Sequence, residues 1–314
     1  MSVFTMQNLG RMGRWGNQVF QYMFVRTYAK RYGLEYGVSP WFGQLLYGHN
    51  DPRIKHQLPS FEERRAETKY PERHLAQAFP PRGDEVQGHD FVGYAQFHTS
   101  YYRPDVDYIR NLFMPREEVL QKSLHGLLKL RSLGNTIVGL HMRRGDTGRL
   151  IFYLTPNQWY LEWLDQHWSR FDKPVLFIAS ETPGDAAAFA KYNPVTAVDL
   201  MPLSTEPYNV YNYLLPDMQN PTPASMDWFP DWYFLTHCNV LAIGNSTFGF
   251  SAAMMGWQLR ELWRSRLSTQ TFSQIDPWDS TPLTYEDLRD HPGIPETWSD
   301  TNTKWDGGEV VVRA

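Results

Sequence analysis

Cysteine is almost absent from this sequence of 314 residues, which contains only Cys238. A single cysteine excludes an intramolecular disulfide framework and a cysteine-rich zinc site. An excess of positive charge is absent too, because 30 Lys and Arg residues stand against 34 Asp and Glu residues, for a formal net charge of −4. Without an overall positive field, neither a nucleic acid nor an anionic membrane surface is an expected partner.

Long hydrophobic runs are also missing. No stretch reaches the roughly 18 uninterrupted apolar residues that a membrane-spanning helix requires. The first ten residues, MSVFTMQNLG, lack the basic region and the apolar stretch of a secretory signal peptide. We therefore expect a soluble, cytoplasmic protein with no membrane span, and we find no sequence signal for its oligomeric state.

A glycine-rich segment follows the first predicted strand. Residues 1–9 are short and partly apolar, which predicts that strand, and three glycines within residues 10–16 then permit a tight turn. Apolar residues recur at helical spacing after the turn, so we expect a helix that Asn17 caps and Gly33 ends. The glycine spacing differs from a dinucleotide-binding fingerprint, and no P-loop lysine follows. The backbone amides here, including that of Gly16, either face a phosphate or hydroxyl or simply form the turn.

The second half of the chain alternates between strands and helices, as parallel βαβ units do. This pattern predicts a Rossmann-like lobe over residues 131–270, preceded by an N-terminal lobe over residues 1–130 and followed by a tail over residues 271–314. The predicted strands cover residues 91–97, 136–142, 174–180, 195–200 and 239–244, and the predicted helices cover residues 103–113, 116–131, 155–168, 183–192, 231–238 and 246–256.

The segment GLHMRRGD places charged groups at the end of a predicted strand. In open parallel sheets ligands bind beyond the carboxyl ends of the strands, which is where His141, Arg143 and Arg144 fall. Arginine suits phosphate because its planar guanidinium keeps its charge and offers paired donors. Such a group would stabilise the negative charge that develops on a departing diphosphate. Taken alone, two arginines are at least as well explained as a surface pair bridged to Asp146 or to a neighbouring acid.

Two further segments have both a structural and a chemical interpretation. In NSTFGF, Ser246 and Thr247 stand where a strand gives way to a helix, so they either hold phosphate oxygens or cap the helix. The same segment matches a glycosylation sequon. Asp105 and Asp107 imitate the Asp-x-Asp pair that holds manganese in one class of sugar transferase, but a helix start also favours Asp. No other cluster has metal-ligand spacing, so we expect no metal.

Four segments occur in an order that resembles the α-1,2-fucosyltransferase family: GRWGNQVFQYMFVRTYAK, VGYAQFHTSYYRPDVDYIRNLF, HMRRGD and DWYFLTHCNVLAIGNSTFGFSAAMMG. Members of that family carry Gly-x-Gly-Asn-Gln-x-Phe-Gln-Tyr, Gly-Tyr-x-Gln, His-x-Arg-Arg-x-Asp and late Asn-Ser-(Ser/Thr)-Phe motifs. The resemblance spans residues 10–256. It implies an α/β, GT-B-like fold with two Rossmann-like lobes facing a central cleft, of which the lobe over residues 1–130 is on the acceptor side and the lobe over residues 131–270 binds GDP-fucose, the donor. It also implies a glycan as acceptor, inversion at the sugar carbon, and no required metal or other cofactor.

The resemblance also implies roles for residues of the arginine motif. Arg143 is the expected main contact of the β-phosphate, with Arg144 supporting it and His141 near the nucleotide. Asp146 is the acid nearest to this motif in the sequence. It either accepts the proton of the acceptor hydroxyl or orients an arginine.

Further residues receive roles from the remaining motifs. Asn17 aligns with the asparagine that peptide O-fucosyltransferases place at the reaction centre, and Gly16 beside it is expected at the donor. Glu181 sits where related enzymes have an acidic residue that accepts from guanine. The late nucleotide-binding segment corresponds to Ser246, Thr247 and Phe248.

The function predicted from these residues is transfer of L-fucose from GDP-fucose to a glycan hydroxyl, with an α-1,2 linkage, typically to galactose. A protein O-fucosyltransferase, or another GDP-sugar transferase of the same fold, is an alternative. A carbohydrate-binding protein without turnover is an alternative from a different class. The sequence departs from the family at GRMGRWGNQ, at FGFSAAMMG and at Thr147, which stands where a tyrosine is common. We expect acceptor selectivity to lie in loops such as residues 41–88.

Overall fold

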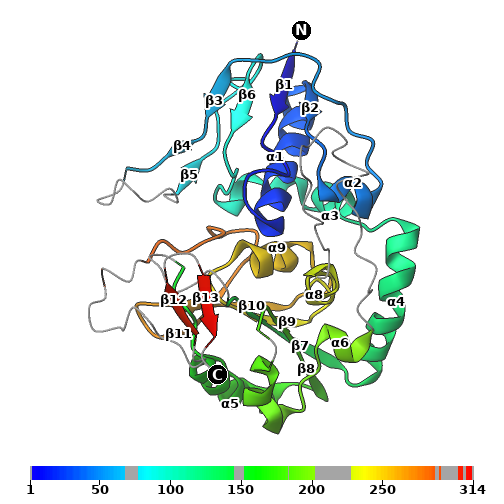
Figure 1. Ribbon diagram of the computed structural model, residues 1–314, viewed down its shortest axis with the longest axis vertical. Helices are drawn as coiled ribbons and strands as arrows, with labels where there is room; N and C mark the ends of the chain where they lie inside the picture. The colour runs from blue at the N-terminus through cyan, green and yellow to red at the C-terminus, as the bar shows by residue number, and fades with distance from the viewer. Residues whose placement is uncertain are drawn as a thin grey trace. The chain divides into compact units, whose positions relative to one another are not determined.

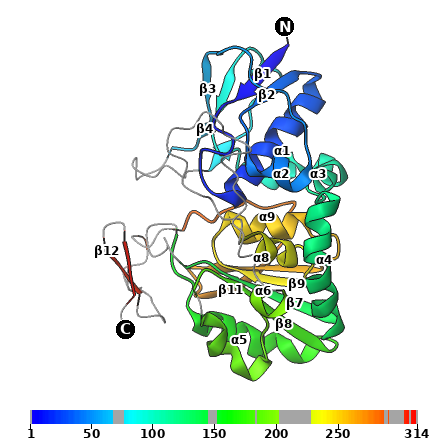
Figure 2. The same cartoon turned by 45° about the vertical axis from the view of Figure 1, so that its right-hand side comes forward.

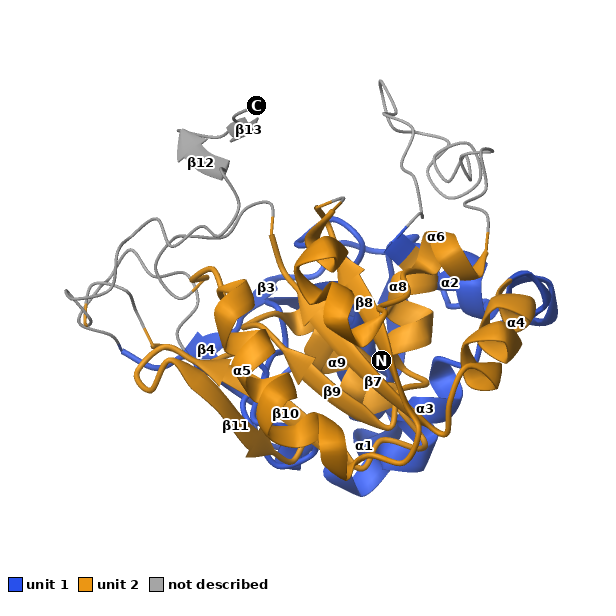
Figure 3. Cartoon of the chain, turned by 90° about the horizontal axis from the view of Figure 1, so that it is seen from below, with its two compact units in different colours: residues 1–122, 204–228, 278–282 blue, residues 123–203, 229–277, 283–314 orange. Residues whose placement is uncertain are grey.

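The computed structural model describes residues 2–67, 77–144, 152–182, 184–201, 228–286, 290, 303–306 and 309–312. The helices and strands are labelled in Figures 1 and 2, and Figure 3 colours the two compact units of the chain. Unit 1 comprises Met1–Lys122, Ser204–Trp228 and Trp278–Pro282, and unit 2 comprises Ser123–Leu203, Phe229–Pro277 and Leu283–Ala314. Among the described residues, no helix is long and apolar enough to cross a membrane.

Unit 1 is built on a four-stranded sheet in which every pairing is parallel. Its strand order is β2-β1-β6-β3. The helix α1 connects β1 to β2 (Figure 1). The elements of this part of the chain are β1 (Val3–Met6), α1 (Trp15–Tyr32), β2 (Glu35–Val38), α2 (Phe42–Tyr47), β3 (Ser60–Glu62), β4 (Arg64–Arg65), β5 (Ala78–Phe79), β6 (Asp90–Val92), η1 (Thr99–Tyr101), η2 (Arg103–Asp105), α3 (Val106–Leu112) and α4 (Glu117–Ser132), which continues into unit 2.

Helix α1 is the central element of the unit 1 core. Phe24 is fully buried, and its ring lies 6.3 Å from that of Phe4 on β1 and 4.3 Å from that of Phe91 on β6. Gly33 ends the helix in the left-handed conformation, at φ 62°, as the sequence predicts. The predicted cap was wrong, because α1 begins two residues before Asn17 and Arg14 takes the N-cap position.

Unit 2 is built on a five-stranded sheet of order β11-β10-β9-β7-β8, which is parallel except for β11 at its edge. Helix α5 lies on one face of this sheet, and α8 and α9 lie on the other (Figure 2). The elements are β7 (Thr136–Met142), α5 (Asn157–His167), η3 (Trp168–Arg170), β8 (Pro174–Ser180), η4 (Asp185–Tyr192), α6 (Ala197–Leu200), α8 (Trp228–Leu235), β9 (Val240–Ile243), α9 (Thr247–Met255), β10 (Glu261–Arg266), β11 (Thr271–Ile275), β12 (Thr303–Asp306) and β13 (Glu309–Val312).

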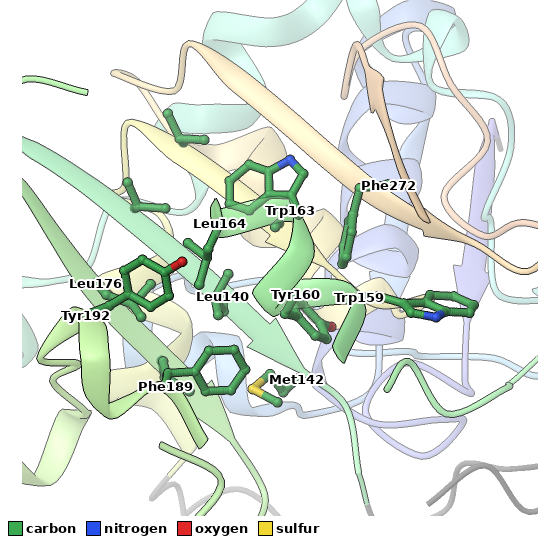
Figure 4. Close-up of a cluster of buried hydrophobic side chains, with 14 of the residues drawn as sticks. Leu140, Met142, Trp159, Tyr160, Trp163, Leu164, Leu176, Phe189, Tyr192 and Phe272 are labelled. Atoms are coloured by element: carbon green, nitrogen blue, oxygen red, sulfur yellow. The ribbon is translucent and has the colours of Figure 1, made fainter. Parts of the chain in front are cut away.

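A buried apolar cluster joins α5 to the sheet of unit 2 (Figure 4). Tyr160, Trp163 and Leu164 extend from α5 and are nearly or fully buried. The ring of Phe272 on β11 lies 4.9 Å from that of Tyr160, and Leu140 on β7 is fully buried in the same cluster. This packing fixes β7, and with it the position at which the arginine motif leaves the sheet.

Most predicted elements of unit 2 are confirmed, and the departures have local causes. The strands predicted over residues 136–142 and 174–180 are β7 and β8 with the same bounds. The strand predicted over residues 195–200 is wrong, because Thr196 and Asp199 form a capping box that starts α6. In unit 1, the strand predicted over residues 91–97 ends at Val92, where the backbone turns.

We predict that Leu164→Ala lowers the free energy of unfolding by about 2 to 5 kcal/mol, because it leaves a cavity in the α5 cluster. Chemical denaturation followed by circular dichroism measures this change. Leu128→Ala is the matched control, since Leu128 also lies on a helix but is 56% exposed. Equal losses in the two variants would contradict the assignment of Leu164 to the core.

Candidate functional site

The strand order of unit 2 defines where a ligand is expected. The chain leaves β7 through α5 and returns to β8 on one side, whereas it leaves β9 through α9 and returns to β10 on the other side. At such a switch point the connections diverge at the carboxyl ends of two neighbouring strands, and open parallel sheets bind ligands there. The arginine motif follows β7, and the segment NSTFGF follows β9. The structure therefore brings together two motifs that lie about a hundred residues apart in the sequence.

Arg143 lies at the N-terminus of α9. Its Nη1 donates a hydrogen bond of 3.4 Å to the Oγ of Ser246, and its Cζ lies 5.4 Å from the centre of the Phe152 ring. Ser246 is the N-cap residue of α9, which is one of the two interpretations that the sequence left open, and its Oγ also accepts from the backbone N–H of Phe248 at 3.3 Å. The guanidinium charge is thereby held beside the backbone N–H groups of the first helical turn.

The start of α9 adds to the anion-attracting character of this edge. The first N–H groups of a helix have no partner within it, and the helix dipole favours negative charge there. Thr247, the first residue of α9, is 7% exposed. A helix start beside an arginine is a combination that suits a diphosphate.

Asn245 anchors the loop that leads into α9. Its Nδ2 donates to the backbone carbonyl of Thr284 at 2.9 Å, and its Oδ1 accepts from the N–H of Thr284 at 2.8 Å. The side chain is 3% exposed. Asn245 is therefore a structural clamp, and the sequon at this position is not accessible in the folded chain.

Arg144 is held quite differently from its neighbour. It is 4% exposed, its Nε donates to Asp185 Oδ2 at 3.0 Å, and its Nη1 donates to the carbonyl of Thr155 at 2.9 Å. Its Nη2 also donates to Asn157. These bonds tie the chain after β7 to the start of α5 and to η4. Arg144 thus supports Arg143 by fixing the backbone on which both stand.

Sequence reasoning missed Asp185. Its carboxylate also accepts from the Oγ of Ser180 at the end of β8, and its side chain is 1% exposed. A buried ion pair between residues 41 positions apart has no local signature. The only available signal is an acidic residue shortly after a strand that neighbours the arginine motif.

His141 is a buried neutral group. Its ring stacks on that of Phe248 at 5.1 Å, and a Cβ on Gly249 would lie 2.7 Å from its Nδ1. Burial, together with the charges of Arg143 and Arg144, lowers the pKa of His141 to about 3. The imidazole therefore packs β7 against α9 without adding positive charge to the edge.

The remaining predicted residues fall in three places. Glu181 is exposed and directly follows β8, on the same sheet edge as Arg143. Gly16 and Asn17 are the second and third residues of α1 and belong to unit 1. Asp146 lies outside the described residues.

The Asp-x-Asp segment, residues 105–107, lies at the start of a helix, which is the structural one of its two interpretations. Asp105 occupies the N-cap position of α3 and forms ion pairs with Lys30 at 2.7 Å and Arg31 at 3.1 Å. Within the part of the chain that the structure describes, no group of three or more His, Cys, Asp or Glu side chains is placed to hold a metal ion.

The fold of the chain has counterparts among solved structures. A crystal structure of NodZ α-1,6-fucosyltransferase soaked with GDP-fucose superposes with a TM-score of 0.50 at 12% identity, over 87% of this chain and 98% of that one. A NodZ structure co-crystallised with GDP gives the same TM-score at 11% identity, over 87% and 97% of the two chains. At these identities the likeness concerns the fold alone, and it confirms the predicted α/β, GT-B-like class.

A curated relative adds a likeness in sequence. Galactoside alpha-(1,2)-fucosyltransferase 2 of Rattus norvegicus is 28% identical over 192 residues, which are 57% of this chain and 51% of the relative. The chain thus matches about half the length of that relative. No protein-family model matches the chain. The relative confirms the resemblance to α-1,2-fucosyltransferases that the four sequence segments indicate.

We predict that Asp185→Asn lowers the free energy of unfolding by about 3 kcal/mol or more, because it leaves the Arg144 charge buried without its counterion. Glu118→Gln, which breaks an ion pair whose acidic side chain is 72% exposed, should change it by no more than about 0.5 kcal/mol. Urea denaturation of the two variants makes the comparison. A loss in Asp185→Asn as small as that in the control would show that the pair does not brace this loop.

We predict that His141 makes the fold less stable in acid. The unfolded chain binds a proton at the ordinary histidine pKa near 6.5, whereas the folded chain does not until about pH 3, so stability falls as the pH drops below 6.5. Between pH 7 and 5 this group alone accounts for about 2 kcal/mol. His141→Gln should reduce the loss over that range by this amount, and His98→Gln, at a half-exposed site, should not. Parallel pH profiles for His141→Gln and the unchanged protein would refute a neutral buried imidazole.

Proposed function

We propose that the chain is a GDP-fucose-dependent fucosyltransferase that transfers L-fucose to a galactoside hydroxyl with inversion. The observation that carries this proposal is the side chain of Arg143 placed against Ser246 at the N-terminus of α9, on the ligand-binding edge of a parallel sheet. The fold shared with NodZ, solved with GDP-fucose and with GDP, supports the donor. The rat relative, named a galactoside α-(1,2)-fucosyltransferase, supports the acceptor and the linkage.

In the proposed reaction, an acceptor oxygen attacks the anomeric carbon of fucose from the side opposite the diphosphate. The new C–O bond forms as the bond between that carbon and the β-phosphate oxygen breaks, and GDP leaves with the electron pair. Arg143 and the first amides of α9 stabilise the negative charge that appears on the diphosphate. The hydroxyl proton passes to a base, for which Asp146 is the candidate from the sequence.

Other predicted residues complete the proposed donor site. Thr247 is the first residue of α9, and the N–H of Phe248 holds the Ser246 cap while its ring stacks on His141. Glu181 is exposed and directly follows β8, on the same sheet edge as Arg143, and its proposed role is to accept hydrogen bonds from guanine. Arg144 acts on the donor only through the backbone that it braces.

We predict that Arg143→Ala lowers kcat/KM for GDP-fucose by about 100-fold or more, since it removes a charged donor from the departing diphosphate. Arg143→Lys should recover part of this loss, because it keeps the charge without the planar pair of donors. GDP binding by calorimetry and product formation by mass spectrometry measure both effects.

Arg170→Ala is the matched control, because Arg170 is an exposed arginine of unit 2 that precedes β8, at the opposite edge of the sheet. It should leave GDP affinity and turnover unchanged. Arg143→Ala protein that binds GDP and turns over as the unchanged protein does would remove this residue from the reaction.

A further inference from the structure

We propose that unit 1 carries a binding site for a hydroxyl of the acceptor sugar, formed by Gln96 and Asn17 at the carboxyl ends of β6 and β1. This inference rests on the proposed function, since it names the side chains that receive the acceptor. Nothing in the resemblance to fucosyltransferases assigns Gln96 a role.

The sheet of unit 1, like that of unit 2, has a point at its carboxyl edge where the connections from two neighbouring strands diverge. β1 lies between β2 and β6, and the chain leaves β1 through a glycine-rich loop and α1 to reach β2 on one side. β6 lies on the other side of β1 and is followed by the segment Gly-Tyr-Ala-Gln, residues 93–96. The loops after these two adjacent strands meet at the carboxyl edge of the sheet, where ligands of parallel sheets bind.

The contact between the two loops is a hydrogen bond between amide side chains. Gln96 Nε2 donates to Asn17 Oδ1 at 2.7 Å. Gln96 is 5% exposed, and its hydrogen bond to Asn17 uses the Nε2 group. The Oε1 of the same amide is an acceptor, to which a donor from outside the chain can bind. Asn17, its partner in this bond, is half-buried.

The orientation of Asn17 is fixed by its surroundings. Gly13 adopts φ +77°, and a Cβ at this position would lie 2.1 Å from Asn17 Nδ2. Gln21, one turn further along α1, donates from Nε2 to the carbonyls of Met12 and Gly93 at 3.2 Å each. The glycine-rich loop and the turn after β6 are thus joined at two points. The Gly-Asn-Gln segment at residues 16–18 and the Gly-Tyr-Ala-Gln segment at residues 93–96 are therefore in contact in the fold.

Glu63 holds the turn that presents Gln96. Its carboxylate accepts from the backbone N–H of Ala95 at 2.6 Å, from that of Tyr94 at 3.3 Å and from Arg65 Nη2 at 3.0 Å. Ala95 adopts φ +55°, a conformation that is strained for a residue with a side chain. The strain persists because Glu63 pairs the N–H of Ala95 while Tyr102 donates to its carbonyl at 2.6 Å. Glu63 is accordingly a positioning residue, buried behind the surface at which a ligand would bind.

The chemistry of this position selects a neutral ligand. The side-chain oxygen of Gln96 can only accept a hydrogen bond, and so can each oxygen of an ionised phosphate, so the two do not pair. A sugar hydroxyl can donate to the Gln96 oxygen and can accept from a neighbouring amide N–H group. Tyr94, half-buried in the same turn with Arg65 at 5.6 Å from its ring, offers an aromatic side chain of the type that packs on sugars. A sugar with several hydroxyls fits this set better than the donor diphosphate does.

The first experiment measures the binding of lactose, used as the galactoside probe, by NMR titration without nucleotide. Gln96→Ala should weaken lactose binding by about tenfold, the loss of one or two hydrogen bonds to uncharged groups. Its affinity for GDP should stay within about twofold of that of the unchanged protein, since the nucleotide is assigned to unit 2. Gln87→Ala, in the turn that precedes β6, is the control and should alter neither affinity.

A second pair of variants tests the positioning role of Glu63. Glu63→Gln places an N–H group where an acceptor is required, which releases the strained turn and should raise the lactose KM in the transfer assay more than it lowers kcat. Ala95→Gly removes the strain that Glu63 offsets. The double variant should therefore recover lactose KM, an outcome that a purely structural loss at Glu63 would not produce.

Two results would overturn this assignment. One is lactose affinity unchanged in Gln96→Ala, and the other is no binding of lactose by the unchanged protein. Failure of the proposed function has a different signature, namely no GDP binding and no release of fucose from GDP-fucose, with lactose binding still dependent on Gln96.

Discussion

The hydrogen bond between Arg143 and Ser246 connects the two strands on which the donor proposal depends. It joins the residue that follows β7 to the N-cap of the helix that follows β9, at the point where their connections diverge. Because the helix start and the guanidinium both attract anions, their contact concentrates positive potential at this edge of the sheet. The surrounding packing serves to hold this contact in place.

The two arginines of the motif divide this task. Arg143 is half-buried at the sheet edge, whereas Arg144 donates its hydrogen bonds to Asp185, Thr155 and Asn157. A buried charge is costly unless it is paired and hydrogen-bonded, and here the pairing locks the backbone of its neighbour. The site proposed in unit 1 has a similar arrangement, in which Glu63 holds the turn that carries Gln96. In both units, the residue proposed to contact a ligand is distinct from the residue that positions it.

Local patterns predicted much of this fold because local forces determine those parts. The continuous apolar run over β7 is buried along its whole length, and Ser246 caps α9 where the change from strand to helix places it. Local patterns failed where side-chain bonds override propensity. Val198 and its neighbours favour a strand, yet the capping box of Thr196 and Asp199 starts a helix. The turn after Val92 depends on the distant carboxylate of Glu63, so no window around Ala95 contains its cause.

The candidate sites show the same limit more sharply. The arginine motif and the cap of α9 could be predicted separately, and their juxtaposition followed from the rule for parallel sheets. The ion pair of Arg144 with Asp185, and the amide pair of Asn17 with Gln96, link residues 41 and 79 positions apart. Such pairs are set by strand order, which a single sequence does not display.

The most direct test of the central claim is a crystal structure of the protein with GDP. The account predicts the β-phosphate within hydrogen-bonding distance of the Arg143 guanidinium and of the first N–H groups of α9, with Arg144 still paired to Asp185. A nucleotide bound elsewhere, or an Arg143 side chain turned away from the diphosphate, would contradict it.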